Sequence, residues 1–193
     1  MGFELNDRVM GLNVQLQSFM DKHIYPREDD WHEWCLDQDK LWTTPPWYDE
    51  LRALAKAEGL WNLFLPHEYQ PWSPGLTNVE IAPLFETMSK VSWAQSVFNC
   101  NAPDRGNMEV LAKYGTEAQQ KEWLQPLLAG EIRSAYAMTE PQVASSDATN
   151  MELEIKRDGD EYVLNGRKWW TTGAVNPRCK VMLVMGKSNP ENP

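Results

Sequence analysis

A loop rich in hydroxyl groups is the first segment whose composition suits ligand chemistry. Residues 135–150 read AYAMTEPQVASSDATN; a predicted strand ends at Met138, and Thr139, Glu140 and Pro141 then turn the chain. Backbone amides and hydroxyls just beyond a strand end can donate hydrogen bonds to the polar edge of a flat ring, which needs donors but no charge. The same composition is typical of a solvated turn, and by itself the loop favours that simpler interpretation.

A second segment carries two adjacent tryptophans followed by two threonines. Residues 168–173 read KWWTTG and follow a predicted hairpin turn at Asn165-Gly166. Because alternate side chains of a strand share one face, Trp170 and Thr172 in a strand would offer an indole and a hydroxyl to the same ligand. Core packing of Trp170 and a neighbouring strand beside Thr172 explain the spacing equally well.

Several other kinds of site have no motif in this chain. There is no G-x-G-x-x-G, Walker or G-x-S-x-G sequence, so a dinucleotide would bind outside a Rossmann turn. The three histidines and three cysteines are far apart and lack metal-ligand spacing, which predicts no metal site and reduced, structural thiols.

Composition indicates a soluble globular protein. The chain has 193 residues, 42% of them apolar and 24% charged, with a net charge of −10. No Lys/Arg cluster suits a phosphate backbone, so nucleic acid is not an expected partner. The first residues lack the pattern of a secretory signal, and no apolar run is long enough for a membrane span. We therefore expect the chain in the cytoplasm, or in an organelle matrix if the source is eukaryotic.

The first two thirds of the chain show helical periodicity. An apolar stripe predicts a first helix that ends near Tyr25-Pro26; its residues are Leu5, Val9, Leu12, Leu16 and Phe19. The sequence Thr43-Thr44-Pro45-Pro46 predicts the start of a second helix that ends at Gly59 and turns Leu51, Leu54 and Ala55 inward.

Two capping boxes mark the starts of later helices. Thr77 with Glu80 predicts one of them, and Thr116 with Gln119 opens another that runs to about Leu128. Gly115 is the expected C-cap of the helix between them.

From Ala135 the period changes to short alternating runs. These predict strands at Leu153 and Ile155, at Tyr162 and Leu164, and at residues 181–185, with hairpin turns at Asp158-Gly159 and Asn165-Gly166. The fold class is therefore α+β: an all-α domain over residues 1–134, then an antiparallel β-domain over residues 135–193. Such a β-unit leaves unpaired edges, so we expect the natural chain to continue beyond Pro193.

Taken together, the two polar segments resemble the signatures of a known family. MTEP followed by SSD, and then NGRKWWTTG, is similar to the FAD-binding sequences MTEP-x-x-GSD and NGxKxWxTxG of the acyl-CoA dehydrogenases. Residues 65–88 and 113–132 resemble helical parts of the same family. The loop departs from the pattern, because it is one residue longer and has Val143, Ala144 and Ser145 in place of glycines. It resembles a subgroup of larger members with unusual acyl substrates.

The resemblance implies residues that contact the flavin. Tyr136, Met138 and Thr139 would contact its isoalloxazine and ribityl groups through backbone and hydroxyl. Trp170 would cover one face of the ring, and Thr172 would hydrogen-bond the N5 edge.

The resemblance also implies where the other groups lie. Ser145 and Ser146 would lie between the flavin phosphate and the CoA chain, with Ser146 also contacting the substrate. No catalytic residue is expected in this chain, because the family's glutamate base is on a C-terminal helical domain. Glu140 belongs to the binding loop and is not that base.

The activity implied is FAD-dependent α,β-dehydrogenation of an acyl-CoA to a trans-2-enoyl-CoA. Its partners would be the acyl-CoA, an electron acceptor such as an electron-transfer flavoprotein, and further copies of the full-length chain. An acyl-CoA oxidase or flavin monooxygenase of the same fold is an alternative. So is a non-catalytic helical interaction module, in which Thr139, Trp170 and Thr172 only pack.

Overall fold

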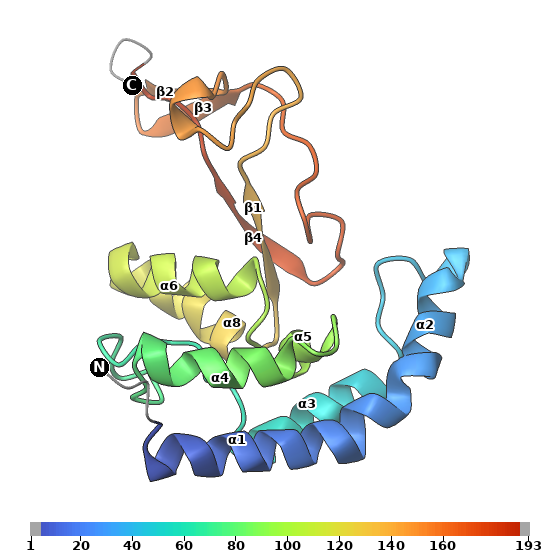
Figure 1. The fold of residues 1–193 in the computed structure, drawn as a ribbon. Helices are drawn as coiled ribbons and strands as arrows, with labels where there is room; N and C mark the ends of the chain where they lie inside the picture. Colours follow the sequence, from blue (N-terminus) through green and yellow to red (C-terminus); the bar gives the residue numbers. More distant parts are fainter. Residues whose placement is uncertain (1–4, 190–193) are drawn as a thin grey trace. The chain divides into compact units, whose positions relative to one another are not determined.

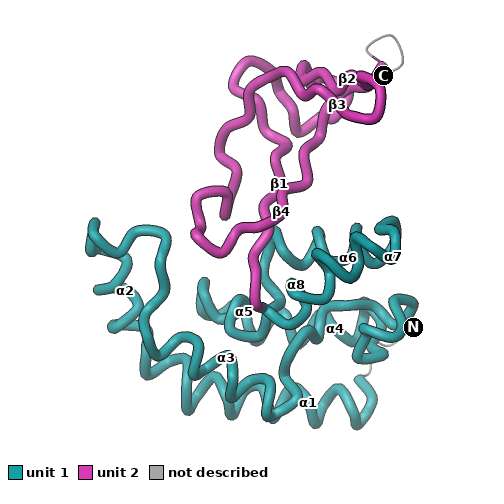
Figure 2. The backbone as a smooth tube through the Cα atoms, turned by 180° about the vertical axis from the view of Figure 1, so that it is seen from behind, with its two compact units in different colours: residues 1–130 teal, residues 131–193 magenta. Residues whose placement is uncertain are grey.

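The computed structural model describes residues 5–189 and divides into two compact units, residues 1–130 and residues 131–193 (Figure 2). The first unit is built from helices, and every strand of the described residues lies in the second (Figure 1). The α+β class is confirmed. The α-helices are α1 Asp7–Phe19, α2 Glu28–Leu36, α3 Trp47–Ala57, α4 Asn78–Met88, α5 Ala94–Val97, α6 Asp104–Tyr114, α7 Glu117–Gln119 and α8 Gln125–Ala129.

The first helix buries residues of its predicted apolar stripe, but the chain stays helical beyond Tyr25-Pro26, where the helix was predicted to end. Val9, Leu16 and Phe19 of α1 are buried. A π-turn over Met20–Ile24 and a 3₁₀ turn over Tyr25–Arg27 then lead directly into α2. Pro26 is tolerated because it lies in the first turn of the 3₁₀ segment, where a backbone N–H has no helical partner to lose.

Helix α3 begins directly after Pro46, as predicted, but its buried face differs by one residue. Leu51 and Ala55 are buried, whereas Leu54 is 41% exposed, so its inward placement was wrong. Arg52 occupies the buried face instead, because its guanidinium donates to the carbonyl of Gly130 at 2.9 Å. At 100° per residue, Leu54 falls outside the stripe that Leu51, Arg52 and Ala55 define.

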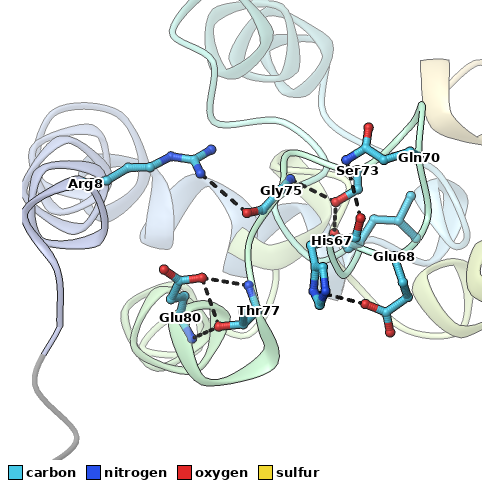
Figure 3. A network of polar contacts seen from close by, with 9 residues as sticks. Arg8, His67, Glu68, Gln70, Ser73, Gly75, Thr77 and Glu80 are labelled. Atoms are coloured by element: carbon cyan, nitrogen blue, oxygen red, sulfur yellow. Dashed lines mark hydrogen bonds and ion pairs between the residues drawn. The ribbon is translucent and has the colours of Figure 1, made fainter.

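Both predicted capping boxes are present. The Thr77 hydroxyl accepts from the amide of Glu80, whose carboxylate accepts from the Thr77 amide at 2.8 Å (Figure 3). Thr116 and Gln119 form the same pair at the start of α7. The amide of Gly115 caps α6 by donating to Leu111, as predicted. These signals are local in sequence, which is why they could be identified before the fold was known.

The loop before α4 is tied back to α1. Arg8 donates to the carbonyls of Pro74 at 2.6 Å and Gly75 at 3.4 Å. Ser73 donates to the carbonyl of Leu65 at 2.8 Å and accepts from the amide of Gly75, which closes the loop on itself (Figure 3).

The strands of the second unit form two separate pairs. They are β1 Arg133–Ala137, β2 Glu154–Asp158, β3 Glu161–Asn165 and β4 Cys179–Val184. Strands β2 and β3 form the antiparallel hairpin predicted at Asp158-Gly159, with Gly159 at a φ of 61°. Strands β1 and β4 are parallel, with Tyr136 opposite Leu183, so the expected antiparallel arrangement was wrong for this pair. Parallel pairing requires a long crossover, and residues 138–178 provide it.

The hairpin predicted at Asn165-Gly166 was wrong. Strand β3 ends at Asn165, and β2 is its only strand partner in the described part of the chain. A Cβ on Gly166 would lie 2.8 Å from the Cα of Leu153. Gly166 therefore allows its backbone to lie close to that of Leu153. The chain runs past Leu153 at this point and does not form a hairpin turn.

Candidate functional site

The first polar segment starts where β1 ends. Ser134, Ala135 and Ala137 of this strand are buried, and Tyr136 between them is 36% exposed. The Tyr136 hydroxyl contacts the sulfur of Met185. Residues 138–147, here called the MTEP loop, follow directly, so the strand fixes the starting point of the loop.

A buried ion pair lies at the centre of the MTEP loop. Glu140 is 4% exposed, and its Oε1 is 2.7 Å from the Nζ of Lys168. The same carboxylate accepts from the backbone amide of Glu152 at 2.7 Å and from that of Leu153 at 3.0 Å. A buried charge of this kind is tolerated only when it is paired and hydrogen-bonded, and Glu140 is both.

These partners decide the ionisation of Glu140. Burial alone would raise the pKa of the carboxyl group, but the hydrogen bonds from Lys168, Glu152 and Leu153 outweigh it and hold the pKa below its ordinary 4.5. The group is therefore an ionised acceptor at neutral pH. Its oxygens already bind three donors, the Lys168 ammonium and the amides of Glu152 and Leu153.

The second polar segment, residues 168–173, is bound to the MTEP loop. Lys168 Nζ donates to the carbonyl of Met138 at 2.8 Å. The amide of Trp169 donates to the carbonyl of Thr139 at 3.1 Å. The structure thus joins two segments whose first residues are 30 positions apart in sequence. We call residues 168–173 the double-Trp segment.

These bonds leave hydrogen-bond donors unused along one edge of the MTEP loop. The carbonyls of Met138 and Thr139 are both engaged, and Thr139 is exposed. Within residues 5–189, no hydrogen bond engages the amides of Met138 and Thr139 or the Thr139 hydroxyl. An edge of free amides and a hydroxyl suits a ligand that presents carbonyl oxygens and ring nitrogens.

The two predicted serines have different surroundings. Ser145 is 2% exposed, and its Oγ accepts from the amide of Glu140 at 2.8 Å. Ser146 is exposed. Ser145 therefore takes part in the internal bonding of the loop, whereas Ser146 faces outward.

Trp170 and Thr172 do not share a strand face, contrary to the expectation. Neither residue lies in a strand, and Trp170 has a left-handed φ of 52°. This conformation is uncommon for a bulky residue, and strained backbone of this kind clusters at functional sites. Trp170 is 79% exposed, so it does not fill a core within the described structure. Its ring centroid is 5.5 Å from that of Trp169.

Thr172 lies in the turn that follows Trp170. It is exposed, and the neighbouring turn is closed by the Ala174 amide, which donates to Thr171 at 3.2 Å. Gly173 has a φ of 86°, and a Cβ there would lie 3.1 Å from the carbonyl oxygen of Ser134. The turn is thereby placed against β1. The structure brings Trp169 to Thr139 but shows no bond between Thr172 and either Trp170 or Thr139.

Lys168 is the functional candidate that sequence reasoning missed. It occupies the lysine position of the NGxKxWxTxG signature, but that pattern assigns it no role, and its side chain is 9% exposed. Lysine is rarely this buried without a specific partner. The partner, Glu140, lies 28 residues away, so local sequence could not identify the pair.

Two other kinds of site are not formed by residues 5–189. No group of three or more histidine, cysteine or acidic side chains is placed to hold a metal ion, and no helix is both long and apolar enough to cross a membrane. The three cysteines are free, and burial raises the pKa of the Cys100 thiol to about 12. That thiol stays protonated, as expected of a structural cysteine.

Comparison with known proteins gives the same family over both units. Residues 12–131 match the acyl-CoA dehydrogenase N-terminal domain, and residues 135–192 match the acyl-CoA dehydrogenase middle domain. Acyl-CoA dehydrogenase family member 10 of Mus musculus is 50% identical over 98% of this chain and 18% of its own length. The probable acyl-CoA dehydrogenase FadE2 of Mycobacterium tuberculosis is 49% identical over 99% of this chain and 46% of its own.

A solved structure shows the same fold. A Mycobacterium abscessus protein described as an acyl-CoA dehydrogenase superposes with a TM-score of 0.87 at 48% identity, covering 94% of this chain and 46% of that one. The chain thus spans less than half the length of these relatives. The two domain matches and the relatives near 50% identity agree with the signatures in the MTEP loop and the double-Trp segment: the chain belongs to the acyl-CoA dehydrogenase family.

Proposed function

We propose that this chain supplies the flavin-binding part of an enzyme that dehydrogenates an acyl-CoA thioester to a trans-2-enoyl-CoA with FAD. The observation that carries the proposal is the bonding of the MTEP loop to the double-Trp segment, through Trp169 to Thr139 and Lys168 to Met138. It places a row of free donors and an exposed indole in one unit. Family membership supports the reaction class.

The chemistry of these groups fits a flavin. An isoalloxazine ring has carbonyl oxygens and nitrogens along one edge and two apolar faces, so it requires donors at the edge and an aromatic or apolar cover. The amides of Met138 and Thr139 and the Thr139 hydroxyl can serve the edge, and Trp170 can cover a face. When bound, FAD supplies the acceptor for hydride from the β-carbon of the substrate.

The remaining site residues take supporting roles in this proposal. Tyr136 lies on β1 beside the loop, and Thr172 is proposed to hydrogen-bond the N5 edge of the flavin. Ser146 faces outward and is the better placed of the two serines for the flavin phosphate or the CoA chain. Ser145 holds the Glu140 amide and contacts such a ligand only with its remaining O–H.

The α-proton of the thioester needs a separate base. We do not assign that role to Glu140, whose carboxylate is ionised and engaged by Lys168 and two amides. A carboxylate elsewhere in the complete enzyme would have to come within about 3 Å of the proton in a pocket that excludes water. An electron-transfer flavoprotein and further copies of the full-length chain complete the proposed partners.

The test is product analysis with the full-length protein. The FAD-loaded enzyme, mixed anaerobically with a panel of acyl-CoA thioesters, should convert at least one into a product two hydrogens lighter, with equal loss of flavin absorbance. Mass spectrometry of the thioester identifies the enoyl product. Reduction of the flavin with no enoyl product would contradict the proposal. Turnover that requires oxygen and yields peroxide would indicate an oxidase instead.

A further inference from the structure

Lys168 and Glu140 form more than an isolated ion pair. Lys168 Nζ binds the Glu140 carboxylate at 2.7 Å and the Met138 carbonyl at 2.8 Å, and lies 3.9 Å from the sulfur of Met151. The ammonium group of Lys168 therefore bonds both to the backbone at the start of the MTEP loop and to the Glu140 side chain two residues later. Its side chain is 9% exposed, so little water competes for these bonds.

Glu140 extends the same network to the residues just before β2. Its two oxygens hold the amides of Glu152 and Leu153, and its own amide is held by Ser145. The pair thus connects the end of β1, the middle of the loop, the approach to β2 and the double-Trp segment. Because Met151 and Leu153 are 2% and 5% exposed, these contacts form a buried polar centre within an apolar surrounding.

The network determines which backbone groups of the loop face outward. Lys168 engages the carbonyl of Met138, and the adjacent Trp169 amide engages the carbonyl of Thr139. The Met138 carbonyl shares a peptide plane with the Thr139 amide, so a carbonyl turned to Lys168 points the Thr139 amide the opposite way and leaves it for a ligand. Loss of Lys168 would free the Met138 carbonyl and allow the peptide planes to rotate.

We propose that the Lys168–Glu140 pair is a positioning device for the flavin: it fixes the peptide between Met138 and Thr139 with its amide toward the ring, while neither side chain touches the ring. The inference rests on the proposed function, since it presumes that FAD binds at this edge. Lys168 and Glu140 are accordingly positioning residues and not catalytic ones.

The test uses full-length protein stripped of FAD and titrated with it by fluorescence. Lys168→Met removes the charge and keeps the length of the side chain, Glu140→Gln keeps its shape, and Lys168→Arg keeps both charge and N–H donors. We expect Lys168→Met to raise the FAD dissociation constant about tenfold or more, and Lys168→Arg to raise it less. The FAD dissociation constant of the double variant Lys168→Met/Glu140→Gln should be at most about twofold higher than that of the single variant that binds FAD more weakly, because the pair acts as a unit.

The matched control is the exposed pair Lys156–Glu154, which lies in the same unit at 3.2 Å. Lys156→Met/Glu154→Gln should leave FAD affinity within about twofold of wild type. Thermal unfolding of each apo-protein is measured in parallel, and titrations are done well below every unfolding temperature. A purely structural role would lower the unfolding temperatures and leave the dissociation constants unchanged, which would overturn the inference.

Misfolding of one variant does not remove the test. If Lys168→Met fails to fold, Lys168→Arg and Glu140→Gln test the inference. Glu140→Gln must then bind FAD more weakly than wild type. Wild-type protein that binds no FAD would overturn the proposed function and this inference together. Normal wild-type binding with equal affinity in the folded variants would overturn the inference alone.

Discussion

At the scale of single residues, exposure divides the proposed site residues into those open to a ligand and those bonded within the MTEP loop. Thr139, Ser146 and Trp170 are exposed, whereas Glu140 and Ser145 are buried. The sequence predicted all of these residues except Glu140 as ligand contacts. It could not separate Ser145 from Ser146, because adjacent hydroxyls in a loop have no periodicity that assigns them to a face.

Trp170 should affect FAD binding but not the stability of the apo-protein. With 79% of its surface exposed, truncation removes little packing, whereas stacking on a flavin face is worth about 0.5–1.5 kcal/mol beyond area burial. Trp170→Ala in the full-length protein should therefore weaken FAD binding about two- to tenfold and leave the apo unfolding temperature unchanged. Fluorescence titration and thermal unfolding measure the two quantities. A lowered unfolding temperature with unchanged affinity would mean that Trp170 only packs.

Glu140 should make stability depend on pH in the acidic range. Its folded pKa lies below the ordinary 4.5, so the folded state favours the ionised form. The resulting stabilisation is complete above about pH 4.5, and it is lost as the pH falls from there through the folded pKa.

Denaturant unfolding of wild type and Glu140→Gln from pH 7 to pH 3 checks this dependence. The difference in unfolding free energy between the two should shrink as the pH falls. A difference that stays constant across that range would show that the charge on Glu140 does not contribute.

At the scale of elements, most of the local signals predicted the structure correctly, and the hairpin at Asn165-Gly166 is an exception. Both capping boxes and the hairpin at Asp158-Gly159 depend on residues within one turn of each other, and all three formed as predicted. The parallel pairing of β1 with β4 joins distant segments, so no local pattern indicates it. Gly166 was misinterpreted because a glycine required for close approach looks identical in sequence to one required for a turn.

The start of α4 should contribute more stability than the start of α7. The Glu80 carboxylate of the first capping box also accepts from Asn6, the N-cap of α1, at 2.5 Å, so one network holds two helix starts. Thr77→Ala should cost about 0.5–2 kcal/mol, toward the upper end of that range.

The matched variant is Thr116→Ala, which removes the second capping box and should cost less. Denaturant unfolding of the full-length protein gives both values. An equal or greater loss for Thr116→Ala would show that the link between Glu80 and Asn6 adds nothing.

Gly166 should tolerate no side chain. A Cβ there would lie 2.8 Å from backbone and side-chain atoms of Leu153, so Gly166→Ala should destabilise the protein by about 1–3 kcal/mol. Gly106→Ala in α6 is the control, because a Cβ at that position meets no atom within 4 Å. The control should be neutral or stabilising, since alanine favours helix. Equal stability of Gly166→Ala and wild type would contradict the described path of the chain.

At the scale of the whole molecule, the family signatures and the fold agree. The helical unit and the strand-bearing unit correspond to matches with the N-terminal and middle domains of acyl-CoA dehydrogenases. The α+β class and the family could be predicted from sequence because they depend on periodicity and on short motifs. The bonding of the MTEP loop to the double-Trp segment could not, since it depends on contacts between distant residues such as Lys168 and Met138.

The most direct test of the central claim is the FAD content of the full-length protein. After reconstitution with excess FAD and removal of the unbound cofactor, the absorption spectrum and the released flavin give the number of FAD molecules per chain. Our account predicts one FAD per chain, as expected if the Met138–Thr139 edge and Trp170 form a flavin site. A folded, full-length protein that remains colourless after reconstitution would contradict it.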